Sequence, residues 1–221
     1  MKKDINCFLF DMDGLLVDSE PLWKRAEKLV FGSLGLDLND ELLRQVMGFR
    51  LPEVIEHWYR YQNWENPDFK KTERAIIDTM KQLINEEAVA MNGVINVLEH
   101  IKSKGGKIAL ASSSSMELIN AVVKKLHIET YFEQLHSAEN EPYGKPHPGI
   151  FITAANAMHA KPHECLIFED SKNGVIAAKA ARMSCIAVPE PLHFNEAWWS
   201  IADAKISSLE QYISIEMSIL N

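Results

Sequence analysis

A short apolar segment near the start of the chain, followed by a polar loop, constrains the fold more than any other feature. Residues Cys7–Phe10 (CFLF) end abruptly at Asp11, the first residue of the sequence DMDG, and this pattern predicts a buried strand that leads into a loop. Residues 19–90 contain no strand pattern. Because one strand cannot form a sheet by itself, it must pair with strands that occur much later in the chain.

The chain after residue 93 alternates between helix and strand patterns. Its strands are short apolar runs, and the helices between them repeat apolar residues at helical spacing. This alternation is typical of a parallel sheet with helices on both faces, so we predict an α/β fold with a Rossmann-like parallel sheet core. The expected strands are 7–10, 107–111, 134–137, 165–168, 184–188 and 204–206, and the expected helices are 94–101, 114–126, 148–158 and 173–181.

The segment between the first strand and this alternating region is expected to be all-helical. The spacing of its apolar residues predicts one helix that starts at Glu20 and ends near Gly35, and three more over 40–47, 52–61 and 68–88. The segment is therefore an insertion into the α/β domain. We predict a core domain made of residues 1–17 and 91–221, and an inserted all-helical cap domain made of residues 18–90.

Charge and cysteine content disfavour several classes of protein. The net charge of −8 disfavours binding to nucleic acid and to anionic membranes. Three cysteines in apolar runs are too few for a disulfide framework and are expected to be buried and reduced. No apolar stretch approaches the roughly 18 residues of a membrane span, and the N-terminus lacks a signal-peptide pattern. We expect a cytoplasmic monomer with no nucleic-acid or membrane partner.

Polar residues follow several of the predicted strands at the point where each strand ends. In an open parallel sheet, ligands bind beyond the carboxyl ends of the strands, so these residues should meet at one edge. Clustered carboxylates need a cation among them, oxygen ligands suit Mg²⁺, and Mg²⁺ favours phosphate, so the set indicates phosphoryl transfer. The residues are Asp11 and Asp13 after the first strand, Ser112–Ser115 after the second, Lys145 before a helix, and Glu169 with Asp170 after the fourth.

The order of these motifs resembles that of the haloacid dehalogenase superfamily. The resemblance rests on DMDGLLVDSE, a serine after the second strand, Lys145-Pro146 and FEDS, and it extends over residues 5–213. The helical insertion after the first motif, with EPYGKPHP and EDSKNGVIAAKAARM, makes the chain most similar to the bacterial 2-deoxyglucose-6-phosphatase and hexitol phosphatase group. The resemblance implies a phosphatase of small sugar phosphates, such as 2-deoxyglucose 6-phosphate or other hexose and hexitol monophosphates.

The resemblance also implies a role for each motif residue. Asp11 would attack phosphorus and form a phosphoaspartate. Asp13 would protonate the leaving sugar oxygen and then activate water for the second step. Ser112 and Ser113 would hydrogen-bond the phosphoryl group, and Lys145 would neutralise the charge on it.

A metal site is implied in the same way. Mg²⁺ would be held by Asp11, by Asp13 through its backbone carbonyl, and by Asp170, with Glu169 as a neighbouring or alternative ligand. Mn²⁺ or Co²⁺ could take its place. The ion would lower the repulsion between the attacking carboxylate and the phosphate.

Three cap residues are candidates for contact with the substrate. Glu20 and Trp23 directly follow the first motif and should face the site, where a ring suits the apolar face of a sugar and a carboxylate accepts from hydroxyls. Arg50 lies in a short break between helices, from which it could reach an anionic substrate.

The nearest alternative is a sugar-phosphate mutase similar to β-phosphoglucomutase, which shares the motifs and the cap. Such mutases hold a second phosphate, and they carry a histidine at the position of Trp23 and a lysine at the position of Ser115. Both are absent here, which favours hydrolysis, although Arg50 keeps the mutase as an alternative function. A dehalogenase would not need Asp13, and a binding protein that had lost catalysis should lack Asp11 or Asp13. Both residues are present, which disfavours these two alternatives.

Overall fold

The sheet has the strand order β3-β2-β1-β4-β5-β6, and its strands run parallel. The computed structural model describes residues 4–220. It confirms the predicted α/β, Rossmann-like fold, and it places β1 between β2 and β4, as one early strand in a late sheet requires. The strands in residues 4–220 are β1 (Cys7–Phe10), β2 (Lys107–Ser112), β3 (Gln134–Ser137), β4 (Cys165–Glu169), β5 (Ser184–Ala187) and β6 (Ala204–Lys205).

Side chains of each central strand alternate between two hydrophobic cores, one on each face of the sheet. On β1, Phe8 and Phe10 enter one core, where Phe10 stacks on Phe168 with 4.6 Å between ring centroids, whereas Cys7 and Leu9 enter the other. Burial on both faces explains why these strands are continuous apolar runs. The first core is completed by α5 (Val94–Ser103), α6 (Met116–Lys125) and α9 (Glu210–Leu220), and the second by α7 (Gly149–Ala157) and α8 (Lys172–Ala180).

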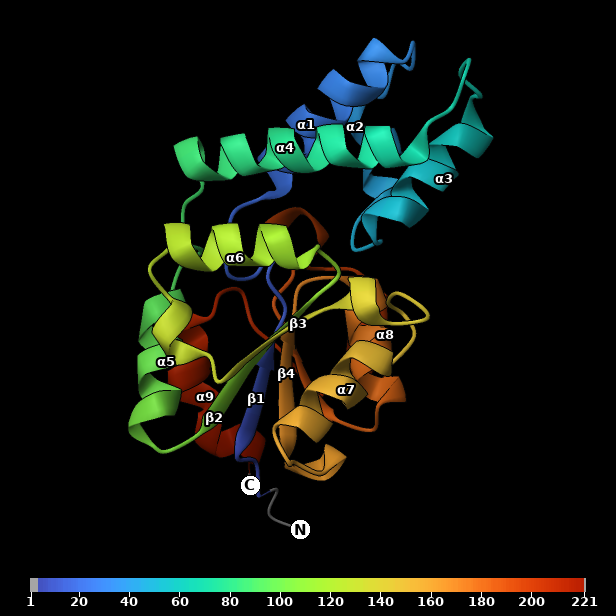
Figure 1. Cartoon of the computed structure of the whole chain (residues 1–221). Coiled ribbons are helices and arrows are strands. Elements are labelled where there is room, and N and C mark those ends of the chain that lie inside the picture. The colour runs from blue at the N-terminus through green and yellow to red at the C-terminus, as the bar shows by residue number, and fades with distance from the viewer. Residues whose placement is uncertain (1–3, 221) are drawn as a thin grey trace.

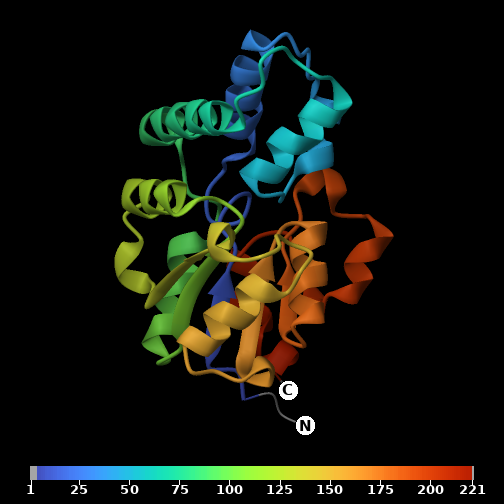
Figure 2. The same cartoon turned by 45° about the vertical axis from the view of Figure 1, so that its right-hand side comes forward.

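Four further helices lie together beyond the carboxyl ends of the strands (Figures 1 and 2). They are α1 (Glu20–Ser33), α2 (Asp40–Leu43), α3 (Leu51–Tyr61) and α4 (Phe69–Glu87). Helix α4 packs against α1, α3 and the core helix α6, where Glu117 pairs with Arg74 at 2.7 Å and with Lys81 at 2.6 Å. The assignment of residues 18–90 as a separate cap domain stays a prediction.

The structure differs from the predicted elements at three helices. The helix expected over 40–47 is the short α2 followed by a 3₁₀ turn, Arg44–Val46, and α6 begins at Met116 because the Ser115 hydroxyl caps it. Helix α9 was not predicted. Within residues 4–220, no helix combines the length and the apolar character of a membrane span.

The buried face of α9 explains why its pattern was hidden. Tyr212 is fully buried, but the next residue on that face is Glu216, which breaks the apolar stripe. Glu216 is 5% exposed, and its carboxylate pairs with His100, in the last turn of α5, at 2.9 Å and with Lys104, directly after that helix. When the partners of a charged residue are distant in sequence, the sequence pattern predicts an exposed position for that residue.

Candidate active site

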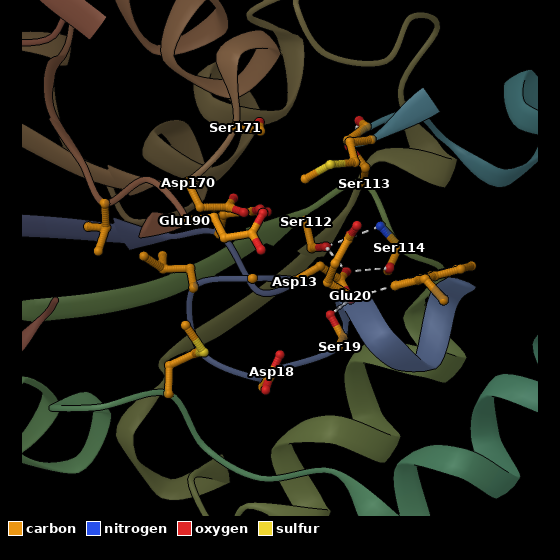
Figure 3. Close-up of a pocket in the computed structure, with 18 of the residues that line it drawn as sticks. Asp13, Asp18, Ser19, Glu20, Ser112, Ser113, Ser114, Asp170, Ser171 and Glu190 are labelled. Atoms are coloured by element: carbon orange, nitrogen blue, oxygen red, sulfur yellow. Dashed lines mark hydrogen bonds between the residues drawn. The ribbon is translucent and has the colours of Figure 1, made fainter. Parts of the chain in front are cut away.

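A pocket of about 470 Å³ lies between the carboxyl ends of β1, β2 and β4 and the helices beyond them (Figure 3). Helix α1 and the loop before α3 form its far wall. The fold therefore brings together segments that are far apart in sequence. Of the predicted site residues, those that line the pocket are Asp11, Asp13, Glu20, Trp23, Ser112, Ser113, Lys145 and Asp170, whereas Glu169 and Arg50 lie outside the lining.

Lys145 is the cationic centre of the site. Its Nζ atom lies 2.8 Å from Asp11 Oδ1 and 2.5 Å from Glu169 Oε1, and all three side chains are buried. Burial by itself lowers the pKa of Lys145, but the charges of Asp11 and Glu169 raise it overall, so the ammonium stays charged. Burial, together with the charge of Glu169, raises the pKa of Asp11 to about 7, although Lys145 opposes the shift.

The carboxylates outnumber this one ammonium group. Asp11, Glu169 and Asp170 each offer an oxygen, and these oxygens lie within 4.8 Å of one another. Burial, and then the charges of Glu169 and Asp11, raise the pKa of Asp170 well above its ordinary value. Oδ1 of Asp170 is buried and has no hydrogen-bond partner among the described residues. An orphaned buried carboxylate oxygen in an oxygen-rich, negatively charged cluster fits a hard divalent cation.

Glu169 is already engaged on both of its oxygens. Oε1 accepts from Lys145, and Oε2 accepts from the backbone N–H of Ser171 at 3.1 Å and from its hydroxyl at 3.0 Å. Glu169 therefore fixes Lys145 and the start of α8, which leaves Asp11 and Asp170 as the freer carboxylates. Its predicted role as a metal ligand stays a prediction.

Asp13 is held by four donors from two parts of the chain (Figure 3). Its Oδ1 accepts from the Ser19 hydroxyl at 2.7 Å and from the Trp23 indole N–H at 2.9 Å. Its Oδ2 accepts from the Ser114 hydroxyl at 2.7 Å and from the Ser112 hydroxyl at 3.5 Å. The carboxylate is thus fixed at the boundary between the sheet edge and α1.

Two predicted site residues connect the loop before α3 to the core. The Ser113 hydroxyl donates to the carbonyl oxygen of Gly48 at 2.9 Å. Arg50 pairs with Glu53 and donates to the carbonyl oxygen of Glu141 at 2.8 Å. In this conformation Arg50 joins the helical segment to the core, and its contact with a substrate stays a prediction.

Sequence reasoning assigned no role to Ser19, Ser114 or Glu27, which also line the pocket. Ser19 and Ser114 hold Asp13, and both stand in motifs that were recognised, DMDGLLVDSE and the serine run after β2. Glu27 lines the pocket from α1. Its signal is the helical spacing from Glu20 and Trp23, which places all three on one helix face.

The position of Glu169 makes Gly174 a sensitive site. A Cβ atom added at Gly174 would lie 1.8 Å from the carboxyl carbon of Glu169. We expect Gly174→Ala to lower the free energy of unfolding by about 3 kcal/mol and to reduce turnover, because Glu169 must move and release Lys145. Thermal unfolding and turnover measure both effects.

Gly32→Ala is the matched control for this substitution. Gly32 is also helical, but a Cβ atom there meets no other atom within 4 Å, so the change should leave turnover intact and raise the unfolding temperature slightly. Full stability and activity in Gly174→Ala would show that Glu169 does not need its observed position.

Comparison with known proteins identifies the family. A model of the family described as haloacid dehalogenase-like hydrolase matches residues 8–188. The chain belongs to the haloacid dehalogenase-like hydrolases. Hexitol phosphatase B of Escherichia coli (strain K12) is 38% identical to it over 210 residues, which are 95% of each chain. A phosphorylated carbohydrates phosphatase of Thermotoga maritima is 34% identical over 217 residues, 96% of this chain and 98% of that relative.

A solved structure agrees with the observed fold. The crystal structure of CbbY from Rhodobacter sphaeroides in complex with phosphate matches with a TM-score of 0.86 and 26% identity, over 94% of this chain and 96% of that one. With the family and the curated relatives, this likeness shows that this haloacid dehalogenase-like hydrolase is an enzyme, a phosphatase that cleaves phosphoric monoesters.

Proposed function

We propose that the enzyme is a Mg²⁺-dependent phosphatase of hexose and hexitol monophosphates that acts through a phosphoaspartate on Asp11. The observation that carries the proposal is the arrangement of the two aspartates. Asp11 lies in the buried charge cluster with Lys145, whereas Asp13 lies beside it at the boundary with α1, held by Trp23. A phosphate bound at Asp11 then has its ester oxygen next to Asp13.

The first chemical step forms a bond from a carboxylate oxygen of Asp11 to phosphorus and breaks the bond from phosphorus to the sugar oxygen. Lys145 fixes Oδ1 of Asp11 and offsets the negative charge that gathers around the phosphoryl group. Asp13 gives its proton to the leaving sugar oxygen. Asp11 and Asp170 would hold Mg²⁺, which would lower the repulsion between carboxylate and phosphate.

The second step hydrolyses the phosphoaspartate. Asp13, which has lost its proton, accepts one from a water molecule as that water attacks phosphorus. The bond between phosphorus and Asp11 breaks, and inorganic phosphate leaves. The same carboxyl group thus acts first as acid and then as base, which explains why four donors fix its position.

The helical segment over residues 18–90 supports this chemistry as a cap. Its contacts with the core, from Ser113 to the Gly48 carbonyl and from Arg50 to the Glu141 carbonyl, close the pocket on one side. The pocket volume of about 470 Å³ suits a ligand of the size of a hexose phosphate. Closure excludes water while the sugar oxygen is still leaving.

Hydrolysis is favoured over phosphoryl transfer between sugar positions by the kind of side chains on the cap wall. A mutase must hold a second phosphate there, but the wall presents the carboxyl groups of Glu20 and Glu27, and Lys24 is already paired with Glu20 at 2.9 Å. Ser115, at the position of the lysine of the mutases, caps α6. The cap wall therefore suits hydroxyl groups better than a second phosphate.

Phosphate release with Mg²⁺ from a panel of sugar phosphates tests the proposal. The panel contains 2-deoxyglucose 6-phosphate, mannose 6-phosphate, sorbitol 6-phosphate and β-glucose 1-phosphate. We expect release from the 6-phosphates and loss of that activity when a chelator removes the metal. Conversion of β-glucose 1-phosphate to glucose 6-phosphate with a bisphosphate primer, without phosphate release, would establish the mutase instead.

A further inference from the structure

Helix α1 presents a polar face to the pocket. Glu20, Trp23, Lys24 and Glu27 are spaced as i, i+3, i+4 and i+7, and all four line the pocket. The first three have polar partners, since Glu20 pairs with Lys24 at 2.9 Å and Trp23 donates to Asp13 at 2.9 Å. Glu27 differs from them.

The Glu27 carboxyl group is buried, and one of its two oxygens lacks a hydrogen-bond partner among the described residues. The residue is 6% exposed, and within the described part of the chain its Oε2 has no hydrogen-bond partner. Burial raises its pKa to about 8, with an addition from the charge of Glu20, although the indole N–H of Trp58, a nearby buried donor, opposes the shift. A carboxyl group in this environment destabilises the folded protein unless something binds it.

The position of Glu27 indicates what binds it. Helix α1 begins beside the sheet edge and runs away from it (Figure 1), so residues later in the helix lie farther from the phosphate position. Trp23 lies close to the expected position of the ester oxygen, because it donates to Asp13, the residue that protonates this oxygen in the proposed reaction. Glu27 follows Trp23 by four residues, a rise of about 6 Å along the helix axis, which is close to the length of a chain of four or five carbons.

We propose that Glu27 is a specificity-determining residue that hydrogen-bonds a hydroxyl group at the far end of a six-carbon sugar or sugar alcohol phosphate. The inference rests on the proposed function, because it concerns the leaving group of that reaction. A hydroxyl group both donates and accepts, so it can hydrogen-bond the Glu27 carboxyl group, which lines the pocket, whether that group is protonated or ionised. A three-carbon substrate would be too short to reach it.

The test compares substrates of different length in two variants. Glu27→Leu removes the polar group at similar volume, and Glu27→Gln retains a hydrogen-bonding side chain. We measure kcat/KM for sorbitol 6-phosphate and for glycerol phosphate, and take their ratio. For Glu27→Leu we expect the ratio to fall about 10- to 100-fold, since one substrate hydroxyl loses its partner, and for Glu27→Gln to fall less.

The unfolding temperature supplies a second readout. Because Glu27→Leu replaces a buried carboxyl group, whose Oε2 lacks a partner among the described residues, with an apolar side chain, we expect a rise of roughly 2–4 °C. Glu41→Leu, at an exposed position of α2, is the control and should leave the ratio unchanged. If Glu27→Leu unfolds at a higher temperature but no longer prefers sorbitol 6-phosphate over glycerol phosphate, Glu27 acts in substrate binding and not in folding.

Two other results would overturn the inference, and they are distinguishable. An unchanged ratio in Glu27→Leu, in an enzyme that hydrolyses sorbitol 6-phosphate, would remove Glu27 from recognition and leave the proposed function intact. If the unaltered enzyme hydrolyses p-nitrophenyl phosphate but no sugar or polyol phosphate, the proposed function itself fails, and the inference about Glu27 fails with it.

Discussion

Asp11→Asn is expected to abolish turnover, with a loss of at least about 10⁴-fold, while the protein stays folded. The amide has the size of the carboxyl group but is a poor nucleophile, so no bond to phosphorus forms. The fold should tolerate the change because the buried cluster holds more carboxylates than ammonium groups. Removing one negative charge weakens the pairing with Lys145 but relieves the repulsion with Glu169 and Asp170.

The measurement combines phosphate release with detection of the covalent intermediate. During turnover the unaltered enzyme should carry a phosphoryl group on Asp11, visible as an added mass that hydroxylamine removes, and the variant should carry none. Asp37→Asn, at an exposed position, serves as the control and should keep full activity. Retention of most of the activity by Asp11→Asn would exclude the phosphoaspartate mechanism.

Features that depend on neighbours in sequence could be predicted. The strand at Cys7–Phe10 is recognisable because both of its faces are buried, so its pattern needs no knowledge of the partners. Asp11, Asp13 and Lys145 were placed together because the carboxyl ends of parallel strands meet at one edge, a rule of the fold rather than of the individual side chains. The family and the sheet follow from the same segments.

Features that depend on distant partners could not be predicted. The sequence shows only that Arg50 lies in a loop. Its hydrogen bonds to the carbonyl oxygens of Ala138 and Glu141 depend on residues 88 and 91 positions later in the chain. The sequence around Glu216 is typical of a surface position, because its partners His100 and Lys104 lie 116 and 112 residues earlier in the chain. The helical spacing of Glu27 can be recognised in the sequence, but the burial of its Oε2 without a hydrogen-bond partner among the described residues is a property of the folded chain alone.

Asp13→Asn is expected to lower turnover of sugar phosphates by roughly 10²- to 10⁴-fold without moving the side chain. The orientation of the amide follows from its partners. The Trp23 indole can only donate, so the amide oxygen must face Trp23 and Ser19. The amide nitrogen then faces Ser112 and Ser114, whose hydroxyl oxygens can accept. The variant therefore keeps the geometry and loses only the transferable proton.

The leaving group separates the two tasks of Asp13. p-Nitrophenolate leaves without needing a proton, so the first step of Asp13→Asn on p-nitrophenyl phosphate should stay fast. The second step still needs a base for water, so the phosphoenzyme should accumulate. In a stopped-flow measurement we expect a burst of p-nitrophenolate equal to the enzyme concentration. A slow steady-state release of p-nitrophenolate should follow, because hydrolysis of the phosphoenzyme limits it.

Trp23→Phe is the matched comparison for this variant. It removes one donor to Asp13 but keeps the carboxyl group, so it should reduce turnover less and show no burst. If Asp13→Asn released p-nitrophenolate without a burst and hydrolysed sugar phosphates at the normal rate, Asp13 would be neither the acid nor the base. A burst on p-nitrophenyl phosphate with slow turnover of sorbitol 6-phosphate would assign both proton transfers to this one carboxyl group, because the two steps share no other altered residue.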